Sequence, residues 1–259
     1  MKKLRIAFYS FTSCEGCQLS LLECEDQILD IVGAVEIVRF REASSFKGGE
    51  FDADADVSFI EGSISTAHDE AALQTVRMRS KKIVAFGACA DLGGVNAIRN
   101  RQDAEVVKER VYGKYVKWIH TSAVRPVSAV VHVDYALHGC PVDKDELARF
   151  LFGLVAGRRW AEPVAPVCFE CKLRQNVCIF HKGGTCLGPI VRGGCRAICP
   201  AYGSGCDGCR GLAPDPNLPL MRRILRDHGL GPDEIGRRLD LFNASAVPDA
   251  MRRELTGRA

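Results

Sequence analysis

The sequence predicts an α/β protein in which a flavodoxin-like parallel sheet domain precedes an irregular, cysteine-rich domain. Strand-like and helix-like segments alternate over about the first 160 residues, which is typical of a parallel sheet covered on both faces. From Glu162 the composition changes, and Cys168 to Cys209 holds eight of the chain's 13 cysteines. With 47% hydrophobic and 26% charged residues in 259, the chain is close to the globular average, which excludes a disordered or fibrous protein.

The spacing of apolar residues predicts each element of the first domain in order. We expect strands at Leu4–Phe11, Val35–Phe40, Asp56–Ile60, Lys82–Phe86 and Pro126–Val133. We expect helices at Leu19–Val32, His68–Ser80 and Asp143–Ala156, the last capped by Asp143.

The remaining chain divides in two. The Pro-rich link Glu162–Pro166 opens a segment that fits no ordinary strand or helix and has too few apolar residues for a core. Metal binding is then the available source of folding free energy. The tail after Gly211 shows helical spacing at Leu220–His228 and Asp233–Phe242. The predicted domains are therefore residues 1–161, 162–211 and 212–259.

Charge and hydropathy exclude several classes of protein. A net charge of +3, from 35 basic and 32 acidic residues, is too balanced for a binder of nucleic acid or anionic membranes. No run of 18 apolar residues predicts a transmembrane segment. The start, MKKLRIAFYSF, has no export signal. We therefore expect a cytoplasmic protein, in which cysteines at CxxC spacing are more often metal ligands or redox groups than disulfides.

Four cysteines follow the predicted strands of the first domain. Cys14 and Cys17 come after the first strand, Cys89 after Lys82–Phe86 and Cys140 after Pro126–Val133. The carboxyl ends of parallel strands share one edge, so the four thiols of this edge set can converge on zinc or a 4Fe-4S cluster. A thioredoxin-like dithiol is the alternative for the first pair, but it leaves the other two cysteines unexplained.

Small residues and one acid accompany the edge set. Gly16, Gly87 and Gly139 allow backbone to approach a bulky cofactor. Glu61 ends the third strand at the same edge, where its carboxylate either supports the metal ligands through hydrogen bonds or relays protons, or is that of an ordinary loop residue.

The cysteine-rich segment contains two further complete groups of four. The 168–186 set is Cys168, Cys171, Cys178 and Cys186, and the 195–209 set is Cys195, Cys199, Cys206 and Cys209. Cysteines at this density predict metal binding, with ferredoxin-type clusters favoured over zinc ribbons because a proline follows Cys199. Cys24 falls outside the sets and is explained as a small buried hydrophobe.

The histidines and glycine-rich loops add little evidence for further binding sites. His181 lies between two cysteines and is an alternative ligand, whereas four other histidines have no partner pattern and are interpreted as structural: His68, His120, His132 and His138. The loop GACADLGG is not a phosphate-binding fingerprint. We expect neither nucleotide nor flavin on this chain.

Five motifs together resemble the small, electron-transferring subunit of nickel–iron hydrogenases, most closely the sulfhydrogenase delta and F420-non-reducing hydrogenase gamma type. They occur in family order across residues 4–211: SCEGCQLSLLE, FIEGSIS, AFGACADLGG, LHGCPVD and the cysteine pattern from 168 to 211. The resemblance implies a proximal 4Fe-4S cluster on the edge set, a distal one on the 168–186 set and a medial one on the 195–209 set.

The resemblance also implies partners: a large subunit with the nickel–iron centre, and flavin or iron–sulfur acceptor subunits near the distal cluster. The chain alone would break no bonds. Two alternatives remain open. A related quinone-reductase or formate-linked subunit carries only the proximal-type cluster and has no eight-cysteine extension. A zinc-stabilised binding module would be spectroscopically silent.

Overall fold

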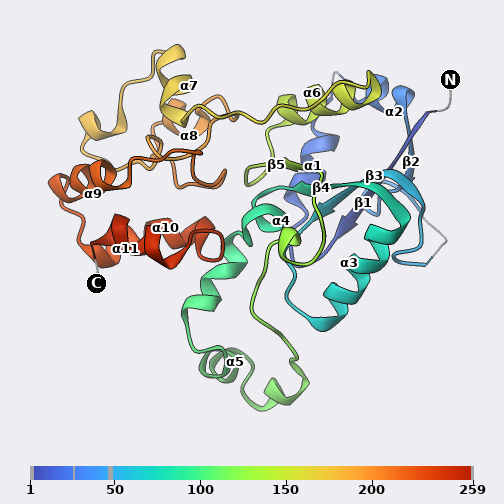
Figure 1. The fold of residues 1–259 in the computed structure, drawn as a ribbon, viewed down its shortest axis with the longest axis horizontal. Coiled ribbons are helices and arrows are strands. Elements are labelled where there is room, and N and C mark those ends of the chain that lie inside the picture. Colours follow the sequence, from blue (N-terminus) through green and yellow to red (C-terminus); the bar gives the residue numbers. More distant parts are fainter. Residues whose placement is uncertain (1–2, 26, 46–48, 258–259) are drawn as a thin grey trace.

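The computed structural model describes residues 3–25, 27–45 and 49–257, and it confirms the predicted fold class. Five parallel strands form one sheet in the order β2-β1-β3-β4-β5, the flavodoxin-like order. The strands are β1 (Leu4–Ser10), β2 (Val35–Arg39), β3 (Ala55–Glu61), β4 (Ser80–Phe86) and β5 (Tyr135–Leu137). An irregular cysteine-rich region follows at the other end of the molecule (Figure 1).

Helices cover both faces of the sheet, and each face has its own hydrophobic core. One face carries α1 (Gly16–Leu22), α2 (Ile28–Ala34) and α6 (Lys144–Val155), and the other carries α3 (Ala67–Arg79) and α4 (Ala88–Leu92). The predicted cap of α6 is confirmed, since Asp143 Oδ1 accepts a hydrogen bond from the Glu146 amide at 2.9 Å.

The strand predicted at Pro126–Val133 is wrong. Val127–Ala129 forms a 3₁₀ turn, η3, and the strand beside β4 is the three-residue β5. Pairing begins only at Asp134, whose amide donates to the Ile83 carbonyl at 2.9 Å. Val127 is buried against the face that carries α3. The apolar run therefore covers the sheet instead of joining it.

The single helix predicted at Leu19–Val32 is also wrong, because the chain turns between α1 and α2. The Gln27 amide donates to the Cys24 carbonyl at 2.8 Å within this turn. The Cys24 thiol is buried, as expected, and it donates to the carbonyls of Ser20 at 3.4 Å and Lys144 at 3.6 Å. The turn is thus held against the start of α6.

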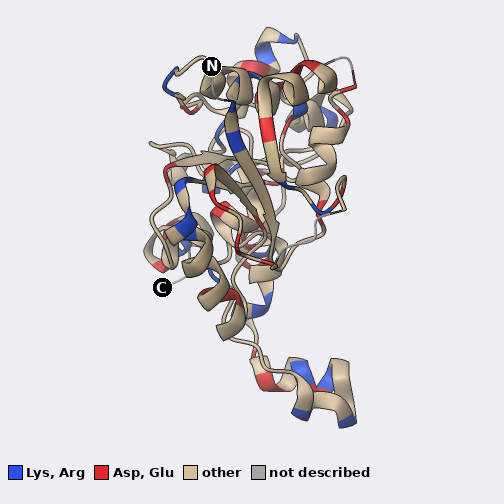
Figure 2. Cartoon of the chain, turned by 90° about the vertical axis from the view of Figure 1, so that its right-hand side faces the viewer, with Lys and Arg blue, Asp and Glu red and all other residues tan. Residues whose placement is uncertain are grey.

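A projection extends from the sheet domain between β4 and β5 (Figures 1 and 2). It comprises α5 (Ala104–Tyr112) and the 3₁₀ helix η2 (Gly113–Trp118), and it follows η1 (Val95–Arg101). Neither α5 nor η2 contains a buried residue. The projection therefore has no core of its own.

The cysteine-rich segment contains only short helices: α7 (Val167–Leu173), η4 (Ile179–Lys182) and α8 (Ile198–Ala201). Both expected tail helices are confirmed, as α9 (Leu218–Asp227) and α10 (Pro232–Asn243), and α11 (Asp249–Thr256) is additional. Segment and tail share one hydrophobic core, which includes Leu187, Ile190, Leu225 and Leu239. The tail thus supplies apolar surface that the segment lacks. Among the described residues, no helix is long and apolar enough to cross a membrane.

Candidate functional site

The four cysteines of the edge set all follow carboxyl ends of strands. Cys14 and Cys17 come after β1, Cys89 lies on α4 after β4, and Cys140 comes after β5. Cys17 is buried, Cys89 is half-buried, and the other two are exposed. The sequence therefore identified the correct edge, although it placed the strand before Cys140 too early.

The thiols of the edge set share one electrostatic neighbourhood. Burial raises the pKa of the Cys17 thiol above its usual range, and the nearby Glu61, Cys140 and Cys89 raise it further. Burial likewise raises the pKa of Cys89 to about 12, helped by Cys140 and Cys14. Such thiols keep their protons in the absence of a cation, so a bound metal group would have to displace those protons and offset the negative charge of the thiolates.

Glu61 lies directly behind Cys17. Its side chain is 2% exposed, and its Oε1 accepts from the Cys17 amide at 3.0 Å. Its Oε2 accepts from the Gln18 amide at 3.3 Å and from the Gln18 side chain at 3.0 Å. Burial raises the pKa of Glu61, and these hydrogen bonds act in the opposite direction. The carboxylate thus holds the first turn of α1.

At two glycines, the absence of a side chain leaves space for a cysteine sulfur of the edge set. Gly87 has φ +88°, and a Cβ there would overlap the Cys17 sulfur. A Cβ on Gly94, at φ +57°, would lie 2.8 Å from the Cys89 sulfur. Both positions combine a backbone conformation that side chains rarely adopt with a sulfur in close approach.

The thiols of the 168–186 set also neighbour one another. Burial raises the pKa of Cys168 to about 11, and Cys186, Cys171 and Cys178 raise it further. The Gly188 amide donates to the Cys186 sulfur at 3.3 Å. The Asn176 side chain donates to the Cys171 sulfur at 3.7 Å.

The thiols of the 195–209 set form a third neighbourhood. Burial raises the pKa of Cys209 to about 12, and Cys195 and Cys199 contribute to the rise. Burial also raises the pKa of Cys206 well above its usual value, and Cys186, Cys209 and Cys195 raise it further. The described residues contain no group of three or more His, Cys, Asp or Glu side chains that could hold a single metal ion.

Two observations place the three sets in a row. Cys140, in the edge set, lies close enough to Cys209 to influence the pKa of its thiol, and both residues line one cavity. The backbone amide of Cys206 donates to the Cys186 sulfur at 3.2 Å. The 195–209 set therefore lies close to both other sets and between them.

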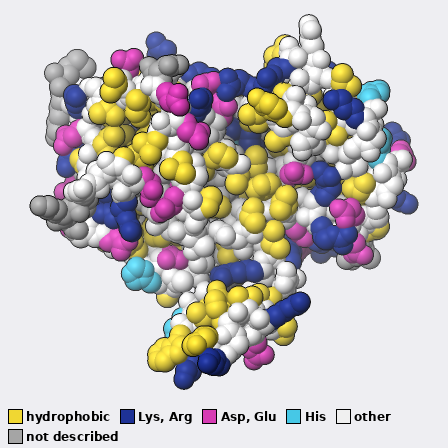
Figure 3. All heavy atoms as spheres, turned by 180° about the vertical axis from the view of Figure 1, so that it is seen from behind, with side chains coloured by type: hydrophobic (Ala, Val, Ile, Leu, Met, Phe, Trp, Pro, Cys, Tyr) yellow, Lys and Arg dark blue, Asp and Glu magenta, His cyan; other side chains and the backbone are white. Residues whose placement is uncertain are grey.

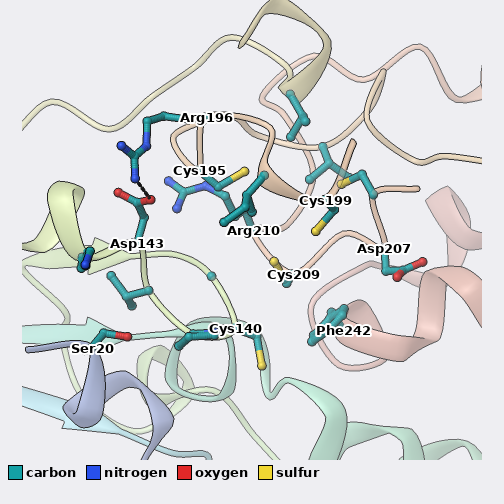
Figure 4. A pocket seen from close by; sticks show the side chains of 18 of the residues that line it. Ser20, Cys140, Asp143, Cys195, Arg196, Cys199, Asp207, Cys209, Arg210 and Phe242 are labelled. Carbon is teal, nitrogen blue, oxygen red and sulfur yellow. Dashed lines mark hydrogen bonds and ion pairs between the residues drawn. The ribbon is translucent and has the colours of Figure 1, made fainter. Parts of the chain in front are cut away.

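A cavity of about 470 Å³ lies where the edge set meets the 195–209 set. Figure 4 shows Cys140 on one side of it and Cys195, Cys199 and Cys209 on the other. Thiols from the sheet domain and from the cysteine-rich segment thus face one space.

His138 and His181 differ in their surroundings. His181 is exposed on η4. His138 is buried, with Asp91 2.7 Å from Nδ1 and Glu162 3.2 Å from Nε2. Burial lowers the pKa of His138, but the hydrogen bonds to the two carboxylates outweigh it and leave that pKa raised.

The sequence did not reveal one buried ion pair at the site. Arg210 and Glu146, each 1% exposed, lie 2.7 Å apart between the cysteine-rich segment and α6. The pair spans 64 positions in the chain, and neither residue belongs to a metal-binding spacing. No sequence signal could have indicated it.

The chain matches the NADH ubiquinone oxidoreductase 20 kDa subunit family over residues 14–154. Two curated relatives extend over both the sheet domain and the cysteine-rich region. The delta subunit of sulfhydrogenase 2 from Pyrococcus furiosus is 39% identical over 244 residues, covering 92% of this chain and 99% of the relative. The G polypeptide of the vhu F420-non-reducing hydrogenase from Methanococcus voltae is 31% identical, covering 96% of this chain and 97% of the relative.

Solved structures agree with this result. A chain of an NAD⁺-reducing [NiFe]-hydrogenase is similar with a TM-score of 0.55 and 28% identity, covering 62% of this chain and 96% of that one. A chain of the Ni-Fe-Se hydrogenase from Desulfomicrobium baculatum, at 17% identity and a TM-score of 0.54, shares the fold over 81% of this chain. The chain therefore belongs to the family of nickel–iron hydrogenase small subunits, of the sulfhydrogenase delta and F420-non-reducing hydrogenase G type, and it is an iron–sulfur, electron-transferring subunit of a hydrogenase complex.

Proposed function

We propose that the chain relays electrons through three 4Fe-4S clusters, between the nickel–iron centre of a large subunit and an acceptor subunit. The edge set would hold the proximal cluster, the 195–209 set the medial one and the 168–186 set the distal one. When bound, such clusters accept and release single electrons at potentials that their surroundings set. A similar protein from Archaeoglobus profundus, 26% identical over 266 residues, is named as the iron–sulfur subunit of an F420-non-reducing hydrogenase.

The proposal rests on the position of the 195–209 set, which lies close to both other sets. Cys209 lines the same cavity as Cys140 at one end of the 195–209 set, and the Cys206 amide donates to the Cys186 sulfur at the other. This arrangement supports the medial position of the 195–209 set, since a carrier between two others must lie close to both. Each set offers four thiols, which is the full ligand complement of a 4Fe-4S cluster.

The protein around the sulfurs would tune the potentials. Two backbone amides, of Cys206 and Gly188, donate to Cys186. Hydrogen bonds to ligand sulfurs stabilise the more negative, reduced form and so raise the potential. The 168–186 set is therefore expected to accept electrons readily from its neighbour.

Exposed apolar side chains support two docking faces. Leu19 and Leu22, 45% and 38% exposed on α1, lie on the helix that carries Cys17, where we place the large subunit. Phe169 and Leu173, 58% and 70% exposed on α7, lie beside the 168–186 set, where we place an acceptor subunit with flavin or clusters. We place the complex in the cytoplasm, whose reducing conditions keep ligand thiols available.

Metal analysis of the anaerobically purified complex tests the proposal. Three 4Fe-4S clusters require about twelve irons per chain and negligible zinc. Electron paramagnetic resonance of the reduced complex should show three interacting clusters. Stoichiometric zinc, with less than half the expected iron, would overturn the proposal.

A further inference from the structure

Arg210 occupies a central place among the cysteine loops. It follows Cys209 directly, and its guanidinium makes a bidentate ion pair with Glu146 on α6, at 2.7 and 2.8 Å. Its Nε donates to the Gly193 carbonyl at 2.6 Å, and its Nη1 donates to the His138 carbonyl at 2.7 Å. One side chain thus contacts both domains.

These contacts lie beside the ligands of two different sets. Gly193 is two residues before Cys195, and His138 is two residues before Cys140. Gly194 passes so close to the guanidinium that a Cβ there would overlap it. Figure 4 shows Arg210 at the cavity, with Cys195 and Cys209 around it. The guanidinium therefore links the backbone on both sides of the gap between the edge set and the 195–209 set.

Net stability alone does not account for this buried ion pair. A buried ion pair gains little over well-packed apolar residues of similar volume, because both charges lose their hydration. Arginine does provide a rigid fork that holds several acceptors in fixed directions. Arg210 therefore adds a fixed geometry and a positive charge that acts on the Cys195 and Cys209 thiols.

We propose that Arg210 is a positioning residue for electron transfer, which fixes the spacing between the edge set and the 195–209 set. Its charge also favours the reduced form of the group held by Cys195 and Cys209, and Glu146 limits this effect. The inference rests on the proposed function, since it assumes that both sets hold redox groups.

Two variants of the assembled, anaerobically purified complex separate geometry from charge. Arg210→Lys keeps the positive charge but loses the bidentate geometry of the guanidinium. Electron transfer out of the edge set should therefore slow on the order of tenfold or more, because small displacements of reacting groups have large effects on rates. The spin–spin interaction between the two clusters should change, with little shift in potential. Glu146→Gln leaves the arginine charge uncompensated, so the potential of the medial cluster should rise in a redox titration.

Arg252→Lys is the matched control, because Arg252 makes a similar bidentate pair with Asp240 in the tail helices, at 3.0 and 2.6 Å. It should leave rate, potential and spin–spin interaction unchanged. If Arg210→Lys does not fold, the double variant Arg210→Met with Glu146→Leu removes both buried charges and should show the same slowing.

The outcomes distinguish the two proposals. A wild-type complex without cluster signals contradicts the proposed function itself. Full iron content, with wild-type transfer rate and spin–spin interaction in Arg210→Lys, overturns the role of Arg210 alone. So does an equal change in Arg252→Lys.

Discussion

At the scale of single residues, buried cysteines of this chain differ in their neighbours rather than in their exposure. Cys17 and Cys24 are 7% and 6% exposed and seven positions apart. Cys17 lies near Glu61 and two other thiols of the edge set, whereas Cys24 donates to two backbone carbonyls. Burial alone therefore does not identify a ligand.

This difference predicts opposite outcomes for two matched variants. Cys17→Ala should abolish hydrogen-dependent dye reduction by the complex, because it removes a proposed proximal ligand. Cys24→Ala should retain that activity and lose only modest stability. Activity and iron content per complex are the measurements. Equal loss in both variants would show that Cys24 is a ligand or that the edge set is wrongly assigned.

A second pair of variants tests the close approach of backbone to sulfur. Gly87→Ala should destabilise the protein on the order of 1–3 kcal/mol, because only glycine readily adopts this conformation, and its Cβ would overlap Cys17. Gly153→Ala on α6 meets nothing within 4 Å and should stabilise by roughly 0.5–1 kcal/mol. Chemical denaturation under anaerobic conditions checks whether the first variant loses stability and the second gains it. A Gly87→Ala variant with unchanged stability would contradict the close approach of this backbone to the Cys17 sulfur.

The contrast between cysteines and Arg210 shows what sequence can indicate at this scale. Local spacing such as Cys14-x-x-Cys17 is visible because the chemistry repeats within a few positions. The Arg210–Glu146 pair forms only when α6 and the last cysteine loop pack together. Tertiary contacts between isolated charges leave no local pattern.

At the scale of elements, the sequence predicted four of the five strands and missed the last. An apolar run such as Pro126–Val133 has the same composition whether it lies within a sheet or against its face. The three-residue β5 is too short to show a periodicity. Cys140 was nevertheless placed at the correct edge, because the chain must return there before α6.

The sequence predicted two tail helices but not their packing, and α9 to α11 complete the core of the cysteine-rich segment. Leu225→Ala on α9, at a fully buried position, should destabilise this region by about 2–5 kcal/mol and accelerate loss of iron. Leu220→Ala on the same helix is the control, since Leu220 is 40% exposed. Thermal unfolding and iron release rates measure the difference. Identical behaviour of the two variants would mean that the tail does not support the segment.

At the scale of the whole molecule, the chain exposes large apolar side chains that a protein acting alone usually buries. The projection formed by α5 and η2 exposes Val111, Tyr115 and Trp118 at 65%, 58% and 70%. Figure 3 shows hydrophobic side chains gathered on it, at the bottom of the view. Isolated helices shorter than about 12–15 residues are marginal in water, so α5, which has no buried residue, would gain stability from a partner that covers it.

Apolar side chains are exposed beside the edge set, over the 168–186 set and on the projection, so folding should depend on a partner that covers them. Obligate interfaces bury on the order of 2,000 Å² or more and leave each partner poorly stable alone. The chain expressed by itself should therefore aggregate or carry few clusters, and co-expression with a nickel–iron large subunit should restore a defined complex. Size-exclusion chromatography with iron analysis is the measurement, and a stable monomer that retains all three clusters would contradict the prediction.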